Sequence, residues 1–194
     1  SIQTSVTTEA SGVFRYKLKP DIAGIWEVSA EWAGNDQYEK MAKQATLEII
    51  VPRELGKAIV VLGGGNRSDN PNWETFNCVA EYVHNVFVKR SFDDEKDIYF
   101  LSPDPNATAG ADNVTSATAL EFAITNWAAK QVNAQVPLYI YLLSHNLKDQ
   151  FLLEKRGSQE TYLTPARLDG WLDQLSEGTS VTIIIEACYA GNFI

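Results

Sequence analysis

Cysteine, methionine and histidine are scarce in this chain: among its 194 residues are 2 cysteines, 1 methionine and 2 histidines. Two cysteines do not make the disulfide framework that supports many small folds. The chain is instead long enough to bury a sizeable core, in one full domain and part of another. Cys78 lies inside an apolar helical pattern, so we expect a buried structural thiol there.

Long apolar runs and an excess of positive charge are also missing. No stretch approaches the ~18 apolar residues that a membrane-spanning helix needs, so we expect no membrane span. The formal net charge is −9. Nucleic acids and anionic lipids attract proteins rich in Lys and Arg, so we expect neither as a partner. We expect a longer parent protein to continue beyond Ser1 and Ile194, and the sequence leaves the oligomeric state open.

The first 52 residues have the pattern of β-structure. Apolar residues recur at every second position over 14–18 and 26–32, and 46–51 is a further apolar segment that ends at Pro52. This period is typical of half-buried strands, and turn residues lie between the segments. Residues 1–52 therefore predict three or four strands of an antiparallel β-sandwich, too few to complete one.

The pattern changes after residue 53 to alternating strands and helices. Strands are predicted at 58–62, 98–101, 138–143 and 181–186, and helices at 73–87, 120–127 and 168–175. The second helix should be capped near Thr115 or Ser116, and the third by Thr164 followed by Pro165. The order βαβαβαβ predicts that 53–194 is an α/β domain with a doubly wound, mostly parallel sheet and helices on both faces.

Two reactive side chains follow neighbouring strands of this predicted sheet. His145 comes after the strand at 138–143, and Cys188 comes after the strand at 181–186. Ligands bind such sheets at the carboxyl ends of the strands. A thiol beside an imidazole can act as a nucleophile, and the imidazole can later protonate a leaving amine. Cys188 and His145 are therefore the candidate catalytic pair.

The residues around this pair resemble a known family. The run Glu186-Ala187-Cys188-Tyr189-Ala190-Gly191 is similar to the nucleophile motif of the legumain-related, caspase-fold cysteine peptidases. The segment 138–145 is similar to the strand that carries the histidine of that family, and the likeness extends over 57–194. Upstream, the stretch 20–36 resembles the closing strands of bacterial immunoglobulin-like domains.

The resemblance implies a caspase-like domain that lacks its C-terminal strands and acts as a secreted or cell-envelope endopeptidase on protein or peptide substrates, without a cofactor or metal. It implies Cys188 as nucleophile and His145 as acid/base. The backbone N–H groups of Asn146 and Cys188 would form the oxyanion hole. Glu186 and Trp73 would contact the substrate.

Two departures from the family pattern motivate an alternative. Ser144 and Asn146 stand where the family has Asp and Gly on either side of the histidine. The alternative is a catalytically degenerate caspase-like domain that acts as a cell-surface adhesion or scaffold module.

Three other patterns have simpler interpretations. The glycines at 63–65 lack the spacing of a dinucleotide site, so a nucleotide-binding α/β domain has no phosphate loop to support it, and a tight turn beside the crevice explains them better. His84 is expected to be solvated or hydrogen-bonded. The oxygen-rich loop 104–112 lacks a terminal Glu for Ca²⁺, so we expect it to hold no metal.

Overall fold

The computed structural model describes residues 4–7, 9, 13, 15–16, 24–37, 39–49 and 55–193. Contacts between Cα atoms divide the chain into two compact units, Ser1–Pro52 and Arg53–Ile194. Among the described residues, no helix is both long enough and apolar enough to span a bilayer.

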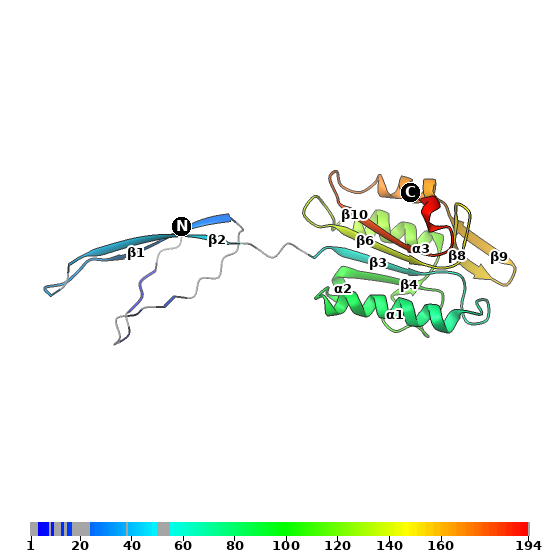
Figure 1. Cartoon of the computed structure of the whole chain (residues 1–194), viewed down its shortest axis with the longest axis horizontal. Coiled ribbons are helices and arrows are strands. Elements are labelled where there is room, and N and C mark those ends of the chain that lie inside the picture. The colour runs from blue at the N-terminus through cyan, green and yellow to red at the C-terminus, as the bar shows by residue number, and fades with distance from the viewer. Residues whose placement is uncertain are drawn as a thin grey trace. The chain divides into compact units, whose positions relative to one another are not determined.

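The first unit contains an antiparallel ribbon of two strands, β1 (Gly24–Trp32) and β2 (Met41–Ile49), shown in Figure 1. β1 contains the alternating segment 26–32. β2 begins earlier than the strand predicted at 46–51, and residues 50 and 51 of that prediction lie outside the described residues. Of the strand predicted at 14–18, residues 15 and 16 are described and lie in no strand. An isolated ribbon buries few side chains, and Met41 is accordingly 68% exposed.

The second unit is a mixed α/β domain around a five-stranded parallel sheet with the order β10-β6-β3-β4-β5 (Figure 1). The long strands lie within one residue of the predicted bounds. The five strands are β3 (Lys57–Leu62), β4 (Ile98–Ser102), β5 (Asn113–Val114), β6 (Leu138–Leu143) and β10 (Val181–Glu186).

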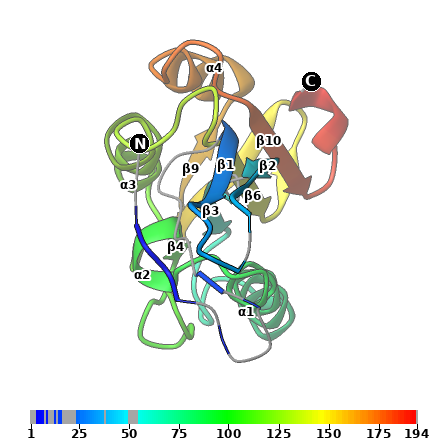
Figure 2. The ribbon, with the colours of Figure 1, turned by 90° about the vertical axis from the view of Figure 1, so that its left-hand side faces the viewer.

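Helices cover the central strands on both faces, as Figures 1 and 2 show. Helix α1 (Trp73–Lys89) packs on one face, in a cluster with Val60 and Phe100. On the other face lie α3 (Ala117–Phe122), its π-helical continuation η1 (Ala123–Ala128) and α4 (Pro165–Leu172), in a cluster that includes Ile59 and Ile140.

The predicted helix caps are present. The Ser116 hydroxyl accepts a hydrogen bond from the Ala119 N–H at the start of α3. The Thr164 hydroxyl accepts one from the Arg167 N–H, with Pro165 in the first turn of α4. These bonds satisfy N–H groups that a helix start leaves unpaired, so both helices begin where the sequence predicts.

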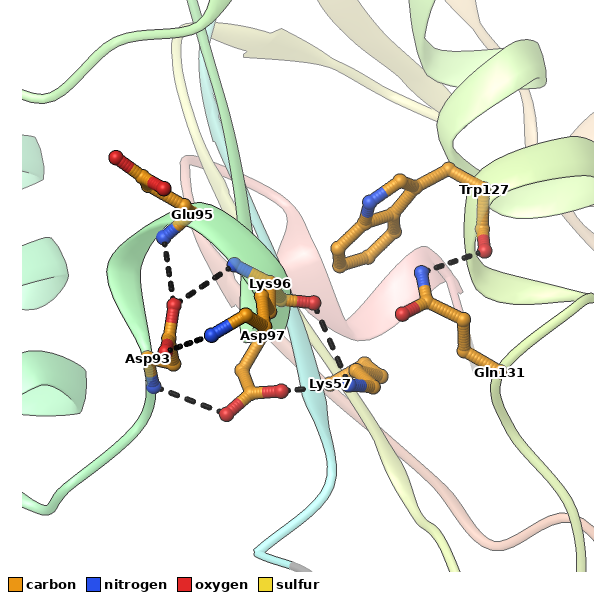
Figure 3. A network of polar contacts seen from close by, with 7 residues as sticks. All are labelled: Lys57, Asp93, Glu95, Lys96, Asp97, Trp127 and Gln131. Carbon is orange, nitrogen blue, oxygen red and sulfur yellow. Dashed lines mark hydrogen bonds and ion pairs between the residues drawn. The ribbon is translucent and has the colours of Figure 1, made fainter.

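A polar network ties the start of β3 to the short helix α2 (Asp94–Asp97), as Figure 3 shows. The Asp93 carboxylate caps α2 by accepting hydrogen bonds from the N–H groups of Glu95 and Lys96. Lys57 Nζ donates to Asp97 Oδ1 at 2.5 Å and to the Lys96 carbonyl at 3.3 Å. The network therefore holds β3 beside the turn that leads into β4.

β10 is more open than predicted. Its Ile-rich sequence is typical of a strand covered on both faces, yet Ile183 is 37% and Ile184 49% exposed. Among the described residues β10 pairs with β6 alone, so it forms an edge of the sheet. An edge strand has fewer neighbours to cover its side chains, and this accounts for the difference.

A three-stranded antiparallel sheet follows β6 and has no counterpart among the predicted elements. It consists of β7 (Asn146–Leu147), β8 (Gln150–Arg156) and β9 (Gln159–Leu163). Figure 1 shows β8 and β9 beyond the end of the parallel sheet at which β3 and β6 finish. The turn at Gly157-Ser158, between segments with apolar residues, is a recognisable hairpin signal.

Helix α1 corrects one expectation and confirms another. Cys78 is exposed rather than buried, because α1 directs Trp73, Ala80 and His84 into the domain instead. His84 is hydrogen-bonded, as predicted: its Nε2 lies 2.6 Å from Asp94 Oδ1. Its ring also stacks on Phe100 with a centroid separation of 5.4 Å, so His84 has a packing role.

Candidate active site

The direction of the chain across the parallel sheet reverses between β3 and β6. From β3 the chain moves to β4 and β5 on one side, and β6 and β10 occupy the other. Loops after two such strands diverge and leave a crevice. Here the crevice is a cavity of about 360 Å³, lined by Gly64, Asp69, Asn70, Pro71, His145, Asn146, Leu147, Leu152, Lys155, Glu160 and Tyr162.

The glycines after β3 allow the hairpin of β8 and β9 to approach this cavity closely. A Cβ on Gly63 would lie 2.4 Å from the Leu152 carbonyl oxygen, and one on Gly64 would lie 3.0 Å from the Ser144 hydroxyl. Gly64 also has φ +84°, a conformation that favours glycine. The Ser144 hydroxyl in turn donates to the Leu152 carbonyl at 2.6 Å. Ser144 therefore anchors the hairpin.

The imidazole of His145 is half-buried and held by two neighbours. Asn70 Oδ1 lies 3.3 Å from His145 Nε2, and the Phe76 ring lies 4.9 Å from the imidazole ring between centroids. Asn70 Oδ1 also accepts the Asn72 backbone N–H at 3.0 Å, which identifies this atom as the oxygen. His145 Nε2 must then carry the proton of the neutral ring, and Nδ1 keeps the basic lone pair.

Asn146 presents its backbone N–H away from the hairpin. The Leu152 N–H donates to the His145 carbonyl, so these two residues form a hydrogen-bonded pair of the antiparallel ladder. Such pairs alternate with non-hydrogen-bonded ones, and Asn146 with Phe151 is the next pair. The Asn146 N–H consequently points away from β8.

Cys188 follows the strand next to the one that leads to His145. Leu143 and Glu186 are partners in the parallel register of β6 and β10, and His145 and Cys188 each follow two residues later. Cys188 is exposed in the turn after β10, next to Tyr189, whose φ is +55°. Among the described residues no hydrogen bond joins its thiol to His145, and the thiol does not line the cavity.

Glu186 and Trp73, the expected substrate contacts, differ sharply in exposure. Glu186 is exposed, and its carboxylate accepts a hydrogen bond from the Tyr141 hydroxyl. Burial, together with this bond, raises the pKa of Tyr141 well above its usual range. Trp73 is only 2% exposed and packs in the core with Phe100, so the structure offers little of its surface to a substrate.

The charged side chains of the cavity are paired with one another or with the backbone. Lys155 Nζ lies 2.8 Å from Glu160 Oε1, and this hydrogen bond holds the pKa of Glu160 below its usual value. Asp69 Oδ1 accepts the Gly157 N–H at 2.9 Å across the hairpin turn. Lys155 and Glu160 therefore neutralise each other, whereas Asp69 keeps its negative charge.

No protein family model, curated protein or solved structure matches this chain.

No metal position is apparent in the described part of the chain, where no three His, Cys, Asp or Glu side chains converge. In the oxygen-rich loop, Asp112 Oδ2 accepts the Phe100 N–H at 2.7 Å, which ties the loop to β4.

The residues that orient His145 were not predicted from the sequence. Asn70 lies 75 positions before His145, and the hairpin was not predicted at all. Asn66, Asn70 and Asn72 alternate with turn residues after β3, at the edge where the crevice forms, and this clustering was the available signal. The arrangement provides an oriented base, an outward N–H donor and a thiol on the adjacent strand end, which are the groups needed for nucleophilic acyl transfer.

Proposed function

We propose that this chain carries the catalytic part of a caspase-fold cysteine endopeptidase related to the legumains, preceded by part of an immunoglobulin-like domain. We further propose a secreted or cell-envelope protein, on the basis of the same resemblance. The proposal depends chiefly on the orientation of His145 by Asn70, because this leaves a basic nitrogen at the strand end next to the one that bears Cys188.

In the proposed reaction the Cys188 thiol gives its proton to His145 Nδ1 and its sulfur attacks the carbonyl carbon of the scissile peptide bond. The backbone N–H groups of Asn146 and Cys188 stabilise the oxyanion that forms on the carbonyl oxygen. His145 then protonates the leaving amine as the C–N bond breaks, and an acyl-enzyme remains. Water, deprotonated by the same imidazole, hydrolyses this thioester and restores the thiol.

Glu186 is the proposed substrate contact close to the nucleophile. Its carboxylate is exposed, two residues before Cys188, and the buried hydroxyl of Tyr141 holds it in place. Trp73 would support this contact only indirectly, through the packing of α1.

Replacement of each cysteine in turn tests the proposal. The chain is incubated with a mixed peptide library and cleavage is followed by mass spectrometry. We expect Cys188→Ala to abolish cleavage and labelling by a peptidyl electrophile. Cys78→Ala is the matched control, because Cys78 is also exposed but lies on α1, and it should retain both. Equal cleavage by the wild type and Cys188→Ala would exclude the mechanism.

The adhesion or scaffold alternative predicts a different result in the same assay. A degenerate domain would cleave nothing as the wild type, and Asn146→Gly, which restores the family residue, would then produce turnover. Cleavage by the wild type rejects this alternative.

A further inference from the structure

The cavity beside His145 contains two buried amides with unused hydrogen-bonding atoms. Asn70 is 2% and Asn146 8% exposed. Within the described residues, Nδ2 of Asn70 and both Nδ2 and Oδ1 of Asn146 have no hydrogen-bond partner. Buried polar atoms in proteins are nearly always hydrogen-bonded to protein or to water, so these three atoms call for partners that the described residues do not supply.

The unused atoms define the chemistry of that partner. Two of them are donors and one is an acceptor, and all belong to neutral groups. Lys155 pairs with Glu160, so an anionic ligand would find no free cation among these residues, and Asp69 adds a negative charge of its own. A neutral amide offers the carbonyl acceptor and N–H donor that the two asparagines lack.

The size and walls of the cavity fit a small amide. Its volume of about 360 Å³ lies near the lower end of the ~300–1,000 Å³ found for ligand pockets. Pro71, Leu147 and Leu152 add apolar surface around the asparagines. Such a site suits the methylene groups and terminal amide of a side chain, or one peptide group.

The strand order indicates which part of a substrate reaches the cavity, a step that rests on the proposed function. β6, which leads to His145, lies between β10, which leads to Cys188, and β3, which leads to Gly64 and Asn70. The strand that leads to His145 therefore separates the strand that leads to the nucleophile from the one that leads to the cavity. Because the imidazole protonates the leaving amine, the amine side of the substrate extends past it toward the cavity.

We propose that this cavity binds a neutral amide of the substrate on the amine side of the scissile bond, with Asn146 and Asn70 as its recognition residues. The amide is either the side chain of Gln or Asn or a peptide group of the substrate main chain.

A peptide series distinguishes these sources. One residue on the amine side is varied among Gln, Glu and Leu, and a further peptide carries an N-methylated bond at the same place. For a side-chain ligand we expect kcat/KM to favour Gln by about tenfold or more over Glu and Leu. For a main-chain ligand the Gln, Glu and Leu peptides should be cleaved with similar kcat/KM, and N-methylation should lower kcat/KM by about tenfold.

Asn146→Asp keeps the shape of the side chain but removes its hydrogen-bond donor. For a side-chain ligand it should reduce the preference for the Gln peptide over the Glu and Leu peptides to about threefold or less. The preference is a ratio within each variant, so a change in overall turnover cancels. Asn126→Asp, an exposed asparagine on η1, is the matched control and should keep the wild-type ratio. Turnover without any preference among the four peptides would overturn the inference and leave the peptidase proposal intact.

A binding measurement separates the two proposals completely. In Cys188→Ala, the side-chain amide NMR signals of Asn70 and Asn146 are followed during titration with propionamide and with propionate, which has the same shape and a negative charge. We expect saturable shifts with propionamide alone. If propionamide causes these shifts but the wild type cleaves no peptide, the amide site is supported and the peptidase proposal is rejected. If propionamide causes no shift, or both compounds cause equal shifts, the amide site is rejected.

Discussion

In the proposed mechanism Asn70 acts through His145, and this gives a prediction at the scale of single side chains. Asn70→Ala removes the acceptor for His145 Nε2, so the ring loses its fixed tautomer and orientation. We expect kcat to fall about 10- to 100-fold, because the imidazole is no longer held. KM should rise as well, because the variant also lacks the amide donor proposed to contact the substrate. Steady-state kinetics on the best peptide from the library checks this.

The control for Asn70 is two residues away. Asn72→Ala removes an exposed side chain that makes no capping hydrogen bond at the start of α1. It should have wild-type kinetics and a wild-type unfolding midpoint. Equal loss of kcat in both variants would mean that the loop as a whole matters, and not the bond to His145.

Tyr141 gives a second prediction, which depends on pH. Tyr141→Phe removes the hydroxyl that donates to Glu186, and we expect a loss of about 1–2 kcal/mol in the free energy of unfolding near pH 7. The folded pKa of Tyr141 is raised, so the folded state holds this proton more tightly than the unfolded state does. The contribution of this proton to the free energy of unfolding is complete below about pH 10, the pKa of tyrosine in the unfolded chain. It falls as the pH rises beyond that value.

Urea unfolding at a series of pH values measures this effect. The wild type should lose more stability than Tyr141→Phe between neutral pH and about pH 11, so the two curves converge. Parallel curves would contradict the assignment of the raised pKa to this residue.

Elements meet most closely where the loop after β3 contacts β8, and glycine makes this contact possible. Gly63→Ala would place a Cβ 2.4 Å from the Leu152 carbonyl. We expect it to cost about 1–3 kcal/mol of stability, because the hairpin must move outward to accommodate the methyl group.

Gly170→Ala is the matched control for Gly63→Ala. Gly170 lies within α4, and a Cβ there would contact nothing within 4 Å. Alanine should therefore raise the free energy of unfolding by about 0.5–1 kcal/mol. Chemical denaturation of both variants measures the pair, and a stable Gly63→Ala would show that the hairpin is less tightly packed than described.

The elements of the α/β unit could be predicted from sequence because their signals are local. The strand bounds at 138–143 and 181–186 and the caps at Ser116 and Thr164 follow from apolar runs and single capping residues. The π-helical turn η1 could not be predicted, because its apolar spacing reads as an ordinary helix. The exposure of β10 depends on which strands are its neighbours, and no local pattern contains that information.

The candidate site was only partly predictable for the same reason. His145 and Cys188 end consecutive strands of the predicted sheet, so their neighbourhood follows from topology alone. The contact with Asn70 joins two loops that are far apart in the sequence, and the burial of Trp73 is decided by how α1 rotates on the sheet.

At the scale of the whole molecule, the apolar core that the structure describes belongs to one of the two units. Among the described residues, both apolar clusters lie within 53–194. A chain restricted to 53–194 should therefore unfold in urea at the same midpoint as the 194-residue chain, since a two-stranded ribbon adds little stability of its own. A shift of the midpoint to lower urea would show that residues 1–52 support the α/β unit.

The cavity beside His145 draws its walls from loops and a hairpin, and the central strands beneath it supply the core. Substitutions in those walls can accumulate without disturbing the layers that keep the domain folded. Natural variants of this protein should consequently diverge fastest in what they recognise, while the strands under the cavity stay nearly constant. A change in ligand preference would thus leave the stability of the domain nearly unchanged.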